Sequence, residues 1–511
     1  MRHLYSLLLL CSIVLWSSCR NDFETKPNNG NLQFSKDTVY LDTIFTGIAS
    51  STYNLKVYNK SDEDITIPSI ELSNGENSKY RLNVDGLPGK SFQNIDILAK
   101  DSIYVFIETT ANIDNFSSTN EYLYTDAIQF DTGAKQQKVE LVTLLKDAIF
   151  LYPEKFNDGS TESLSFGVDE EGNETFIEGF FLDDSELNFN NQKPYVIYGY
   201  AAVPGNRTLT IDAGSRIHFH KNSGIIVAEN GSLHVNGELS SDQESLEKEV
   251  IFESDRQEPN FSDTPGQWGA IWLTQGSTNN SINYTTIKNA TVGVLMDSND
   301  GTSNPTLSIN NSKIYNSSNV GLLARTGNIE GSNLVINNAG QSALQLSLGG
   351  TYNFTNCTFA NYWTGSYRSL PAVLLQNYLE TAEEIFASDL IEANFYNCII
   401  YGNENRELIL DPLEEVAFNY KFENCLIKFN KFGFGNNEGY NFEDETLFPN
   451  SIINEDPNFL DASKNLFMIN EESAANSLAN PSTATSQDIL GQPRNNEPDT
   501  GAYESIIFPE E

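Results

Sequence analysis

Between residues 32 and 148 the chain alternates apolar and polar positions in short runs. Turn-forming residues separate seven such runs: TVYLDTIF, YNLKVYN, DITIPSIEL, YRLNVDG, DSIYVFIE, DAIQF and KVELVTLL. Alternation with a period of two places successive side chains on opposite faces of a strand. Short strands with frequent turns predict an antiparallel β-sandwich over residues 32–148, because that arrangement buries one face of each sheet.

The following part of the chain repeats a different strand pattern. Its recurring apolar positions advance by 27, 21, 24, 41 and 27 residues along the series Ile287, Ile314, Val335, Phe359, Ile400 and Ile427. Repeats of about 20–30 residues, made of short strands and broken by Asn and Gly, are typical of a solenoid. Leucine-rich repeats are excluded because their leucine spacing and helical segments are absent. The pattern predicts a right-handed parallel β-helix over residues 195–430, with inward side chains stacked from coil to coil.

The sequence F-x-N-C-x-φ, where φ is apolar, occurs three times in this repeat. Its asparagines, Asn356, Asn397 and Asn424, are expected to adopt the left-handed conformation of a sharp corner and to form a hydrogen-bonded ladder. Its cysteines are Cys357, Cys398 and Cys425. Each lies two positions before an inward apolar residue, which predicts stacked, buried free thiols. Stacked coils also bring α-carbons near the separation of a disulfide, so pairing of two cysteines stays open.

Three segments interrupt or flank the repeat. Within the 41-residue step, residues 377–394 carry apolar side chains at i, i+3 and i+4 and predict a short helix. Residues 431–511 lose the repeat and become rich in Asn, Glu and Pro. A parallel β-helix exposes an open strand edge at each end. We therefore expect residues 149–194 to form a connector and N-terminal cap, and residues 431–511 to form a mostly irregular C-terminal cap.

A basic start and a short apolar run open the chain, before two serines and Cys19. The run is shorter than the roughly 20 residues that span a membrane, and it predicts a secretory signal peptide over residues 1–18. Cys19 resembles the acylated cysteine of the bacterial lipoprotein lipobox. An ordinary cleaved signal with an incidental cysteine is the alternative. Residues 19–31 lack apolar periodicity, which predicts a flexible tether.

The residues that begin at Cys19, CRNDFE, resemble the acidic tag that carries lipoproteins of the Bacteroidetes to the outer face of their outer membrane. The resemblance implies a protein that faces the cell exterior and contacts the membrane through its lipid anchor alone. Tripeptides that begin at Asp37, Asp42 and Asp101 also fit the O-glycosylation sequence of that phylum. Chance occurrence in Thr-rich strands is the alternative.

Composition narrows the range of partners. The chain has 70 acidic and 30 basic residues, and its formal net charge is −40. This charge excludes nucleic acid as an expected partner and disfavours direct binding to an anionic surface. Aromatic and β-branched residues fill the apolar positions, which favours strands over helices. We expect a monomer without an obligatory cofactor.

The sequence contains few candidate catalytic residues. The series NTD, DD, GHG and RIK, with which polygalacturonase-like hydrolases place paired carboxylates on successive coils, does not occur. His218 and His220 are two residues apart, so both are expected to face outward from one strand, and His234 follows one coil later. The three histidines are a candidate metal site. Solvated surface histidines are the alternative.

A second candidate metal site lies in an acidic turn. The sequence MDSNDGTSN, residues 296–304, resembles a calcium loop, and its candidate ligands are Asp297, Asn299 and Asp300. Carboxylate and amide oxygens are the ligands that calcium prefers. A polar turn between two strands explains the same residues. Calcium is therefore the one cofactor that the sequence raises.

Aromatic residues gather in the loop inside the 41-residue step. Trp363, Tyr367 and Arg368 are expected to lie partly exposed at the rim of a groove, where rings stack on sugar rings. Insertions in a solenoid project from one face, which is often the binding face. The alternative is that these residues cover the inserted helix. Trp268 and Trp272, in QWGAIWL, are expected in the core.

The repeat and the sandwich together resemble Bacteroidetes surface lipoproteins with an immunoglobulin-like domain and a pectin-lyase-like right-handed β-helix; RLNVDG and DSIYVFIE carry the resemblance in the sandwich. It implies an all-β fold and leaves activity open, because fold does not determine function. We expect a non-enzymatic protein that binds glycans or other cell-surface partners. A polysaccharide lyase or glycoside hydrolase with an unrecognised site is the alternative.

Overall fold

The computed structural model describes residues 24–116, 119–168, 172–381, 384–430 and 440–509. The chain divides between Asp147 and Ala148 into two compact units. In the described part of the chain, no helix has the length and apolar character needed to cross a membrane. The predicted signal peptide and Cys19 lie outside the described residues.

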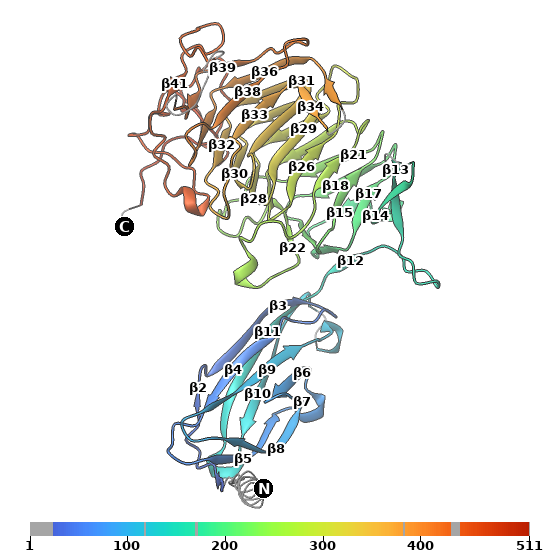
Figure 1. Cartoon of the computed structure of the whole chain (residues 1–511), viewed down its shortest axis with the longest axis vertical. Helices are drawn as coiled ribbons and strands as arrows, with labels where there is room; N and C mark the ends of the chain where they lie inside the picture. The colour runs from blue at the N-terminus through green and yellow to red at the C-terminus, as the bar shows by residue number, and fades with distance from the viewer. Residues whose placement is uncertain (1–23, 117–118, 169–171, 382–383, 431–439, 510–511) are drawn as a thin grey trace, which may run out of the picture. The chain divides into compact units, whose positions relative to one another are not determined.

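The first unit is an immunoglobulin-like sandwich in which two sheets enclose one apolar core (Figure 1). One sheet contains β1 (Lys26–Pro27), β3 (Thr38–Phe45), β5 (Ile65–Leu72), β8 (Ser91–Ile97), β10 (Glu121–Phe130) and β11 (Gln137–Lys146). The other contains β2 (Gln33–Phe34), β4 (Tyr53–Tyr58), β6 (Tyr80–Val84), β7 (Leu87–Gly89) and β9 (Ser102–Thr109). Most neighbours are antiparallel, as predicted, but β1 and β3 pair in parallel with β5 and β11.

The period-two pattern places side chains in this unit as the sequence predicts. Along β9, Ile103, Val105 and Ile107 are buried, whereas Tyr104 and Phe106 face outward. Burying such side chains stabilises the sandwich by about 1.5–3 kcal/mol each. The outward residues of β9 therefore leave an aromatic surface on the sheet that contains β2, β4, β6 and β7.

The second unit contains two long parallel sheets, the arrangement of a parallel β-helix (Figure 1). The first parallel sheet contains β12 (Ile149–Leu151), β16 (Tyr195–Ile197), β19 (Arg216–Phe219), β22 (Val250–Ser254), β25 (Thr285–Lys288), β28 (Lys313–Ser317), β30 (Val335–Ala339), β32 (Thr358–Asn361), β37 (Ile399–Gly402), β40 (Leu426–Ile427) and β41 (Ile452–Ile453). Its strands come from successive coils, so residues that are a coil apart in sequence become hydrogen-bonded neighbours.

The second parallel sheet receives the other strands of each coil. It contains β14 (Glu174–Phe181), β15 (Asn188–Phe189), β17 (Tyr200–Val203), β18 (Thr208–Asp212), β20 (Gly224–Val227), β21 (Ser232–Asn236), β23 (Ile271–Leu273), β24 (Asn280–Asn283), β26 (Val292–Met296), β27 (Leu307–Asn310), β29 (Val320–Ser332), β31 (Leu344–Thr355), β33 (Val373–Gln376), β36 (Leu390–Tyr396), β38 (Leu408–Asp411) and β39 (Lys421–Glu423). At its edge, β13 (Ser163–Val168) pairs antiparallel with β14.

The predicted column of inward residues is present, with one error of register. Ile314 pairs with Ile287 on one side and with Ile336 on the other, and all three are fully buried in the core. Val335, which the sequence alignment places in the column, therefore faces the opposite side of its strand. A shift of one residue reverses every side chain of a strand, so the correct steps around β30 are 22 and 23 residues.

The coils begin earlier in the chain than the repeat predicts. In the segment 149–194, which the sequence predicts to be a connector and cap, β12 pairs in parallel with β16. Likewise β14 pairs with β17 and β15 with β18. The segment therefore supplies strands of a first coil, and β13 departs from that coil by pairing antiparallel with β14.

The predicted helix at residues 377–394 is wrong. This segment contains β34 (Tyr378–Glu380) and β35 (Ile385–Ala387), which pair antiparallel, followed by the start of β36. Ile385 and Phe386 are exposed. The coils on both sides stay in register, since β32 pairs directly with β37. The hairpin is thus an insertion that leaves the stacking of the coils intact.

The corner asparagines adopt the predicted conformation but not the predicted ladder. They are Asn356, Asn397 and Asn424, with φ of 52°, 55° and 53°. Their amides donate to backbone oxygens of residues 478–501 at 2.7–3.4 Å. A ladder of the predicted kind joins Asn333 to Asn311 in earlier coils, at 2.9 Å. The later asparagines bond to a C-terminal segment instead of to one another, because that segment occupies their side of the coils.

The phenylalanines and cysteines of the same motif point into the core. The rings of Phe354, Phe395 and Phe422 stack with centroid separations of 5.4 and 4.7 Å, and Phe448 continues the stack at 5.6 Å. The three cysteines, Cys357, Cys398 and Cys425, are buried free thiols. Burial raises the pKa of the Cys398 thiol well above its ordinary value. These thiols are therefore core residues of low reactivity.

The C-terminal segment, defined here as residues 455–506, covers one side of the coils. Its apolar residues pack against outward side chains of the first parallel sheet: Val335, Ala360, Ile399 and Leu426. The sequence predicts an end cap for residues 431–511. In the structure, Phe448 and β41 continue the coils at that end, while the C-terminal segment lies along the side of the first parallel sheet.

Candidate functional site

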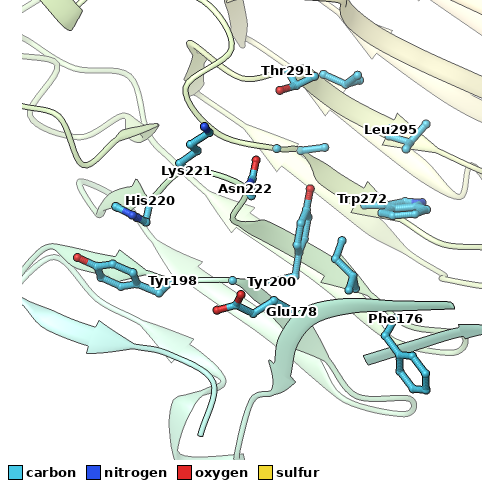
Figure 2. A pocket seen from close by; sticks show the side chains of 15 residues that line it. Phe176, Glu178, Tyr198, Tyr200, His220, Lys221, Asn222, Trp272, Thr291 and Leu295 are labelled. Carbon is cyan, nitrogen blue, oxygen red and sulfur yellow. The ribbon is translucent and has the colours of Figure 1, made fainter. Parts of the chain in front are cut away.

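A groove with a volume of about 650 Å³ opens where the β13–β14 hairpin meets the first coils (Figure 2). Phe176 and Glu178 enter it from β14, and Tyr198 from the end of β16. His220 follows β19, and Trp272 lies on β23. Thr291 and Leu295, from the coil of β26, also line it, so residues from five consecutive coils meet at one surface.

Trp272 forms one wall of the groove, and contacts with Asp297 and Phe166 fix its side chain. Its indole nitrogen donates a hydrogen bond to Asp297, and the Phe166 ring stacks on it at 4.6 Å between centroids. Arg325 donates to the other oxygen of Asp297 at 3.0 Å. The indole is half-buried. The prediction that Trp272 is a core residue is therefore wrong, whereas Trp268 is buried as predicted.

Tyr200 forms the floor, and two glycines make room for it. A Cβ atom on Gly269 would lie 1.9 Å from the Tyr200 hydroxyl oxygen, and one on Gly224 would lie 2.6 Å from its ring. Non-bonded carbon atoms normally approach to about 3.5–4.0 Å. Any larger residue at either glycine would displace the ring, so the shape of the groove depends on both.

Ionisable side chains stand beside these rings. The imidazole of His220 stacks on Tyr198 at 4.5 Å, and its Nδ1 donates to a carboxylate oxygen of Asp255 at 2.7 Å. This hydrogen bond is the main reason that the pKa of His220 is raised above 6.5, and the charge of Glu178 adds to it. Lys221 and Asn222 complete the polar side of the groove. The surface thus offers a carboxylate, an imidazole, an ammonium and an amide beside four aromatic side chains, those of Phe176, Tyr198, Tyr200 and Trp272.

The three histidines of the predicted metal site do not lie together in the structure. His218 lies on the outward side of β19, opposite the core residues Ile217 and Phe219, as predicted. It is nevertheless buried there, and its Nδ1 lies 3.1 Å from the Ser254 backbone oxygen. His234 contacts the backbone oxygen of Asn279 at 3.0 Å. The side chain of His220 faces the groove instead. Within the described ranges, no group of three or more His, Cys, Asp or Glu side chains is arranged to hold a metal ion.

The candidate calcium ligands are engaged within the protein. Asp297 accepts from Trp272 and Arg325, as described above. Asn299 accepts from the Gly301 backbone nitrogen at 2.8 Å and donates to Thr326 at 2.7 Å. Asp300 accepts from the hydroxyls of Thr278 and Thr302. The three residues therefore stabilise their own turn, the structural alternative that the sequence left open.

The predicted aromatic site around residues 361–368 is only partly exposed. Tyr367 is 89% exposed, and the half-buried Trp363 donates to the Ser366 hydroxyl at 3.0 Å. Arg368 is only 3% exposed, which contradicts its predicted place at a rim. Its guanidinium pairs with Glu407 at 2.7 Å, and burial raises the pKa of that carboxyl. Arg368 therefore anchors the loop and is not free to contact a ligand.

Comparison with known proteins identifies no family. No family model matches the chain, and no curated protein matches it. Similar solved structures include a family 123 glycoside hydrolase from Clostridium perfringens, with 7% identity over 24% of this chain and 30% of that chain, and a TM-score of 0.16. The match thus spans less than a third of that hydrolase.

Two further similar structures are PapD-like. PapD-like domain 7 of human CEP192 shows 12% identity over 26% of this chain and 94% of that chain, with a TM-score of 0.16. The periplasmic chaperone SfaE shows 16% identity over 29% of this chain and 82% of that chain, with a TM-score of 0.15. These likenesses concern the fold alone, that of an N-terminal immunoglobulin-like sandwich.

Proposed function

We propose that this protein is a cell-surface lipoprotein of the Bacteroidetes type that binds glycans in the groove lined by Tyr198 and Trp272. The observation that supports this proposal is the alternation of aromatic rings with hydrogen-bonding groups along the groove. Aromatic faces stack on the apolar faces of sugar rings, and carboxylate, amide and ammonium groups pair with hydroxyls. The site proposed from the sequence, at Trp363, Tyr367 and Arg368, is replaced by this groove.

The chemistry of the groove favours a polar ring over an apolar ligand. Glu178, His220 and Lys221 carry ionisable groups at its surface and are exposed to solvent. A fully apolar ligand would cover Glu178 and Lys221 without offering either a hydrogen-bond partner, which costs about 1–3 kcal/mol for each group. A sugar supplies both an apolar face for the rings and hydroxyls for the polar groups.

Substitution of one ring tests the proposal. Tyr198→Ala should weaken retention on an array of neutral and acidic polysaccharides about fivefold, because one ring contact contributes about 1 kcal/mol. Tyr367→Ala removes an exposed ring outside the groove and is the matched control. Both variants should melt like the wild type. Equal retention by wild type and Tyr198→Ala, on every glycan that the protein binds, would refute the groove as the site.

A second candidate function is cleavage of the bound glycan. It is favoured by the presence of Glu178 and the His220–Asp255 pair in the same groove, since a carboxylate and an imidazole with a raised pKa are groups that transfer protons. Release of reducing or unsaturated ends would demonstrate it. Glu178→Gln should then abolish turnover and leave retention in place. Retention without any released ends favours binding alone.

Attachment to the outer membrane is proposed from the residues around Cys19. Cys19→Ser should release the protein from membranes, and protease applied to intact cells should degrade the wild type. Replacing Asp22 and Glu24 with alanine should keep the lipid but reduce surface exposure. A soluble, unmodified wild type would refute the anchor. Unchanged exposure of the alanine variant would refute only the export tag.

A further inference from the structure

The outward face of the sandwich sheet formed by β2, β4, β6, β7 and β9 carries a second aromatic surface. Tyr104 and Phe106 are 45% and 41% exposed on β9, with centroids 6.0 Å apart and ring planes 17° apart. Phe106 pairs with Asn54 on one side and with Asn83 on the other. Two nearly parallel exposed rings therefore lie beside a strand, β4, that presents the exposed amide of Asn54.

Lysines border the same rings. The Lys56 ammonium lies 5.1 Å from the Tyr104 centroid and 5.4 Å from the Tyr58 centroid, and the Lys60 ammonium lies 4.3 Å from the Tyr58 centroid. Such cation–π contacts attract the ammonium groups toward the ring faces. No ion pair among the described residues of this unit involves Lys56 or Lys60. Both charges therefore lack a carboxylate partner in the described structure.

The positive charge of Lys56 and Lys60 contrasts with the negative net charge of the chain. The chain has a formal net charge of −40, yet two carboxylates near these lysines pair with other cations: Glu108 lies 3.6 Å from Arg81, and Asp62 lies 3.0 Å from Lys100. At physiological ionic strength, charges more than about 8 Å away are largely screened. An anion at this face consequently meets the two lysines locally rather than the net charge of the chain.

We propose that this sandwich face binds a carboxylated polysaccharide. Sugar rings stack on Tyr104 and Phe106, and their carboxylates pair with Lys56 and Lys60. The exposed amide of Asn54 stands at one side, where a sugar hydroxyl would lie. This site is separate from the groove of the second unit, and neither site depends on the other.

Two cellulose ethers with one backbone isolate the role of charge. Affinity electrophoresis of the full chain in carboxymethylcellulose should show retardation that weakens as salt rises, and the neutral hydroxyethylcellulose should retard it at least fivefold less. Equal retardation by both polymers would overturn the proposal. So would retardation that is insensitive to salt.

Matched substitutions locate the site. Lys56→Gln combined with Lys60→Gln should reduce affinity for carboxymethylcellulose at least fivefold, and Tyr104→Ala should do the same. Lys138→Gln removes a lysine of the other sheet, one paired with Glu140, and should change nothing. An equal loss in Lys138→Gln would show a nonspecific charge effect and refute the site.

Two controls distinguish binding at this face from binding in the groove and from self-association. Tyr198→Ala should leave binding of carboxymethylcellulose unchanged; if it abolishes that binding, the anion occupies the groove and the inference fails while the proposed function stands. Analytical ultracentrifugation tests whether this face binds a second copy of the chain instead of a polysaccharide. If the wild type is a dimer that Tyr104→Ala converts to a monomer, the face is a protein interface and the inference is wrong.

Discussion

Arg368 and Glu407 form an ion pair in the interior of the β-helix, with guanidinium nitrogens 2.7 and 2.9 Å from the two carboxylate oxygens. Glu407 also accepts the backbone N–H groups of Glu404 and Ala372. Arg368 donates further bonds to the backbone oxygens of Asn361 and Leu370. The pair therefore fastens the aromatic loop that follows β32 to the next coil.

Breaking this pair should destabilise the second unit strongly. Arg368→Ala leaves the buried carboxylate of Glu407 without its cationic partner, and such a loss costs about 3–5 kcal/mol. Arg207→Ala breaks the exposed pair with Asp184 and should have no measurable effect. Chemical denaturation, followed by a signal from the second unit, compares them. Equal unfolding free energies for the two variants would contradict this interpretation.

The inward column gives a second stability prediction. Ile314 is fully buried between Ile287 and Ile336, so Ile314→Ala should cost about 2–5 kcal/mol in calorimetry. Ile314→Asp should be worse, because a carboxylate would be buried without a partner. Ile391→Ala, at a residue that is 62% exposed, is the control. A small effect of Ile314→Ala would mean that the coils tolerate a cavity.

Asn397 allows backbone strain and side-chain bonding to be separated. Its φ is 55°, and its side chain accepts from the Asn480 backbone nitrogen at 2.8 Å. Asn397→Gly keeps the left-handed conformation and loses only the side-chain bonds. Asn397→Ala also adds strain of about 1–2 kcal/mol. Both variants should increase hydrogen exchange in the C-terminal segment, and the alanine variant should also be the less stable of the two. Identical melting would show that the strain is relieved elsewhere.

His220 predicts a dependence of stability on pH. Its folded pKa is raised above 6.5, mainly by the hydrogen bond to Asp255. A raised folded pKa means that the stabilisation is fully present below the unfolded value near 6.5 and is lost as pH rises through the folded value. His220→Gln should remove this contribution, so the melting temperatures of wild type and variant should converge on raising the pH from 6 to 8. A constant difference over that range would contradict the assignment.

The repeat in the sequence predicts the coils but not every register within them. Val335 and Ile336 are adjacent and both apolar, and each is buried, one against the C-terminal segment and the other in the core. Hydrophobicity alone does not distinguish two buried faces. The sequence wrongly predicts a helix where β34 and β35 form a hairpin. The reason is related, because the exposed Ile385 and Phe386 have the spacing of apolar residues in an amphipathic helix.

The functional surface is harder to predict than the fold. The partner of Arg368 is Glu407, 39 residues away, and a charged residue in a loop is ordinarily assigned to solvent. The groove requires Tyr198, His220 and Trp272 from successive coils together with the β13–β14 hairpin, which the sequence pattern assigns to a connector. The sequence does contain one indication of the groove. Tyr198 and His220 are 22 residues apart, which is the length of one coil and places them side by side on neighbouring coils.

The C-terminal segment has a consequence for biosynthesis. Residues 455–506 leave the ribosome after the coils that they cover, so the outward faces of Val335, Ala360, Ile399 and Leu426 stay bare while the chain is being made. Open apolar strand surfaces of this kind favour aggregation. A chain that ends before residue 455 would therefore keep these apolar side chains uncovered, and it should aggregate more readily than the full chain.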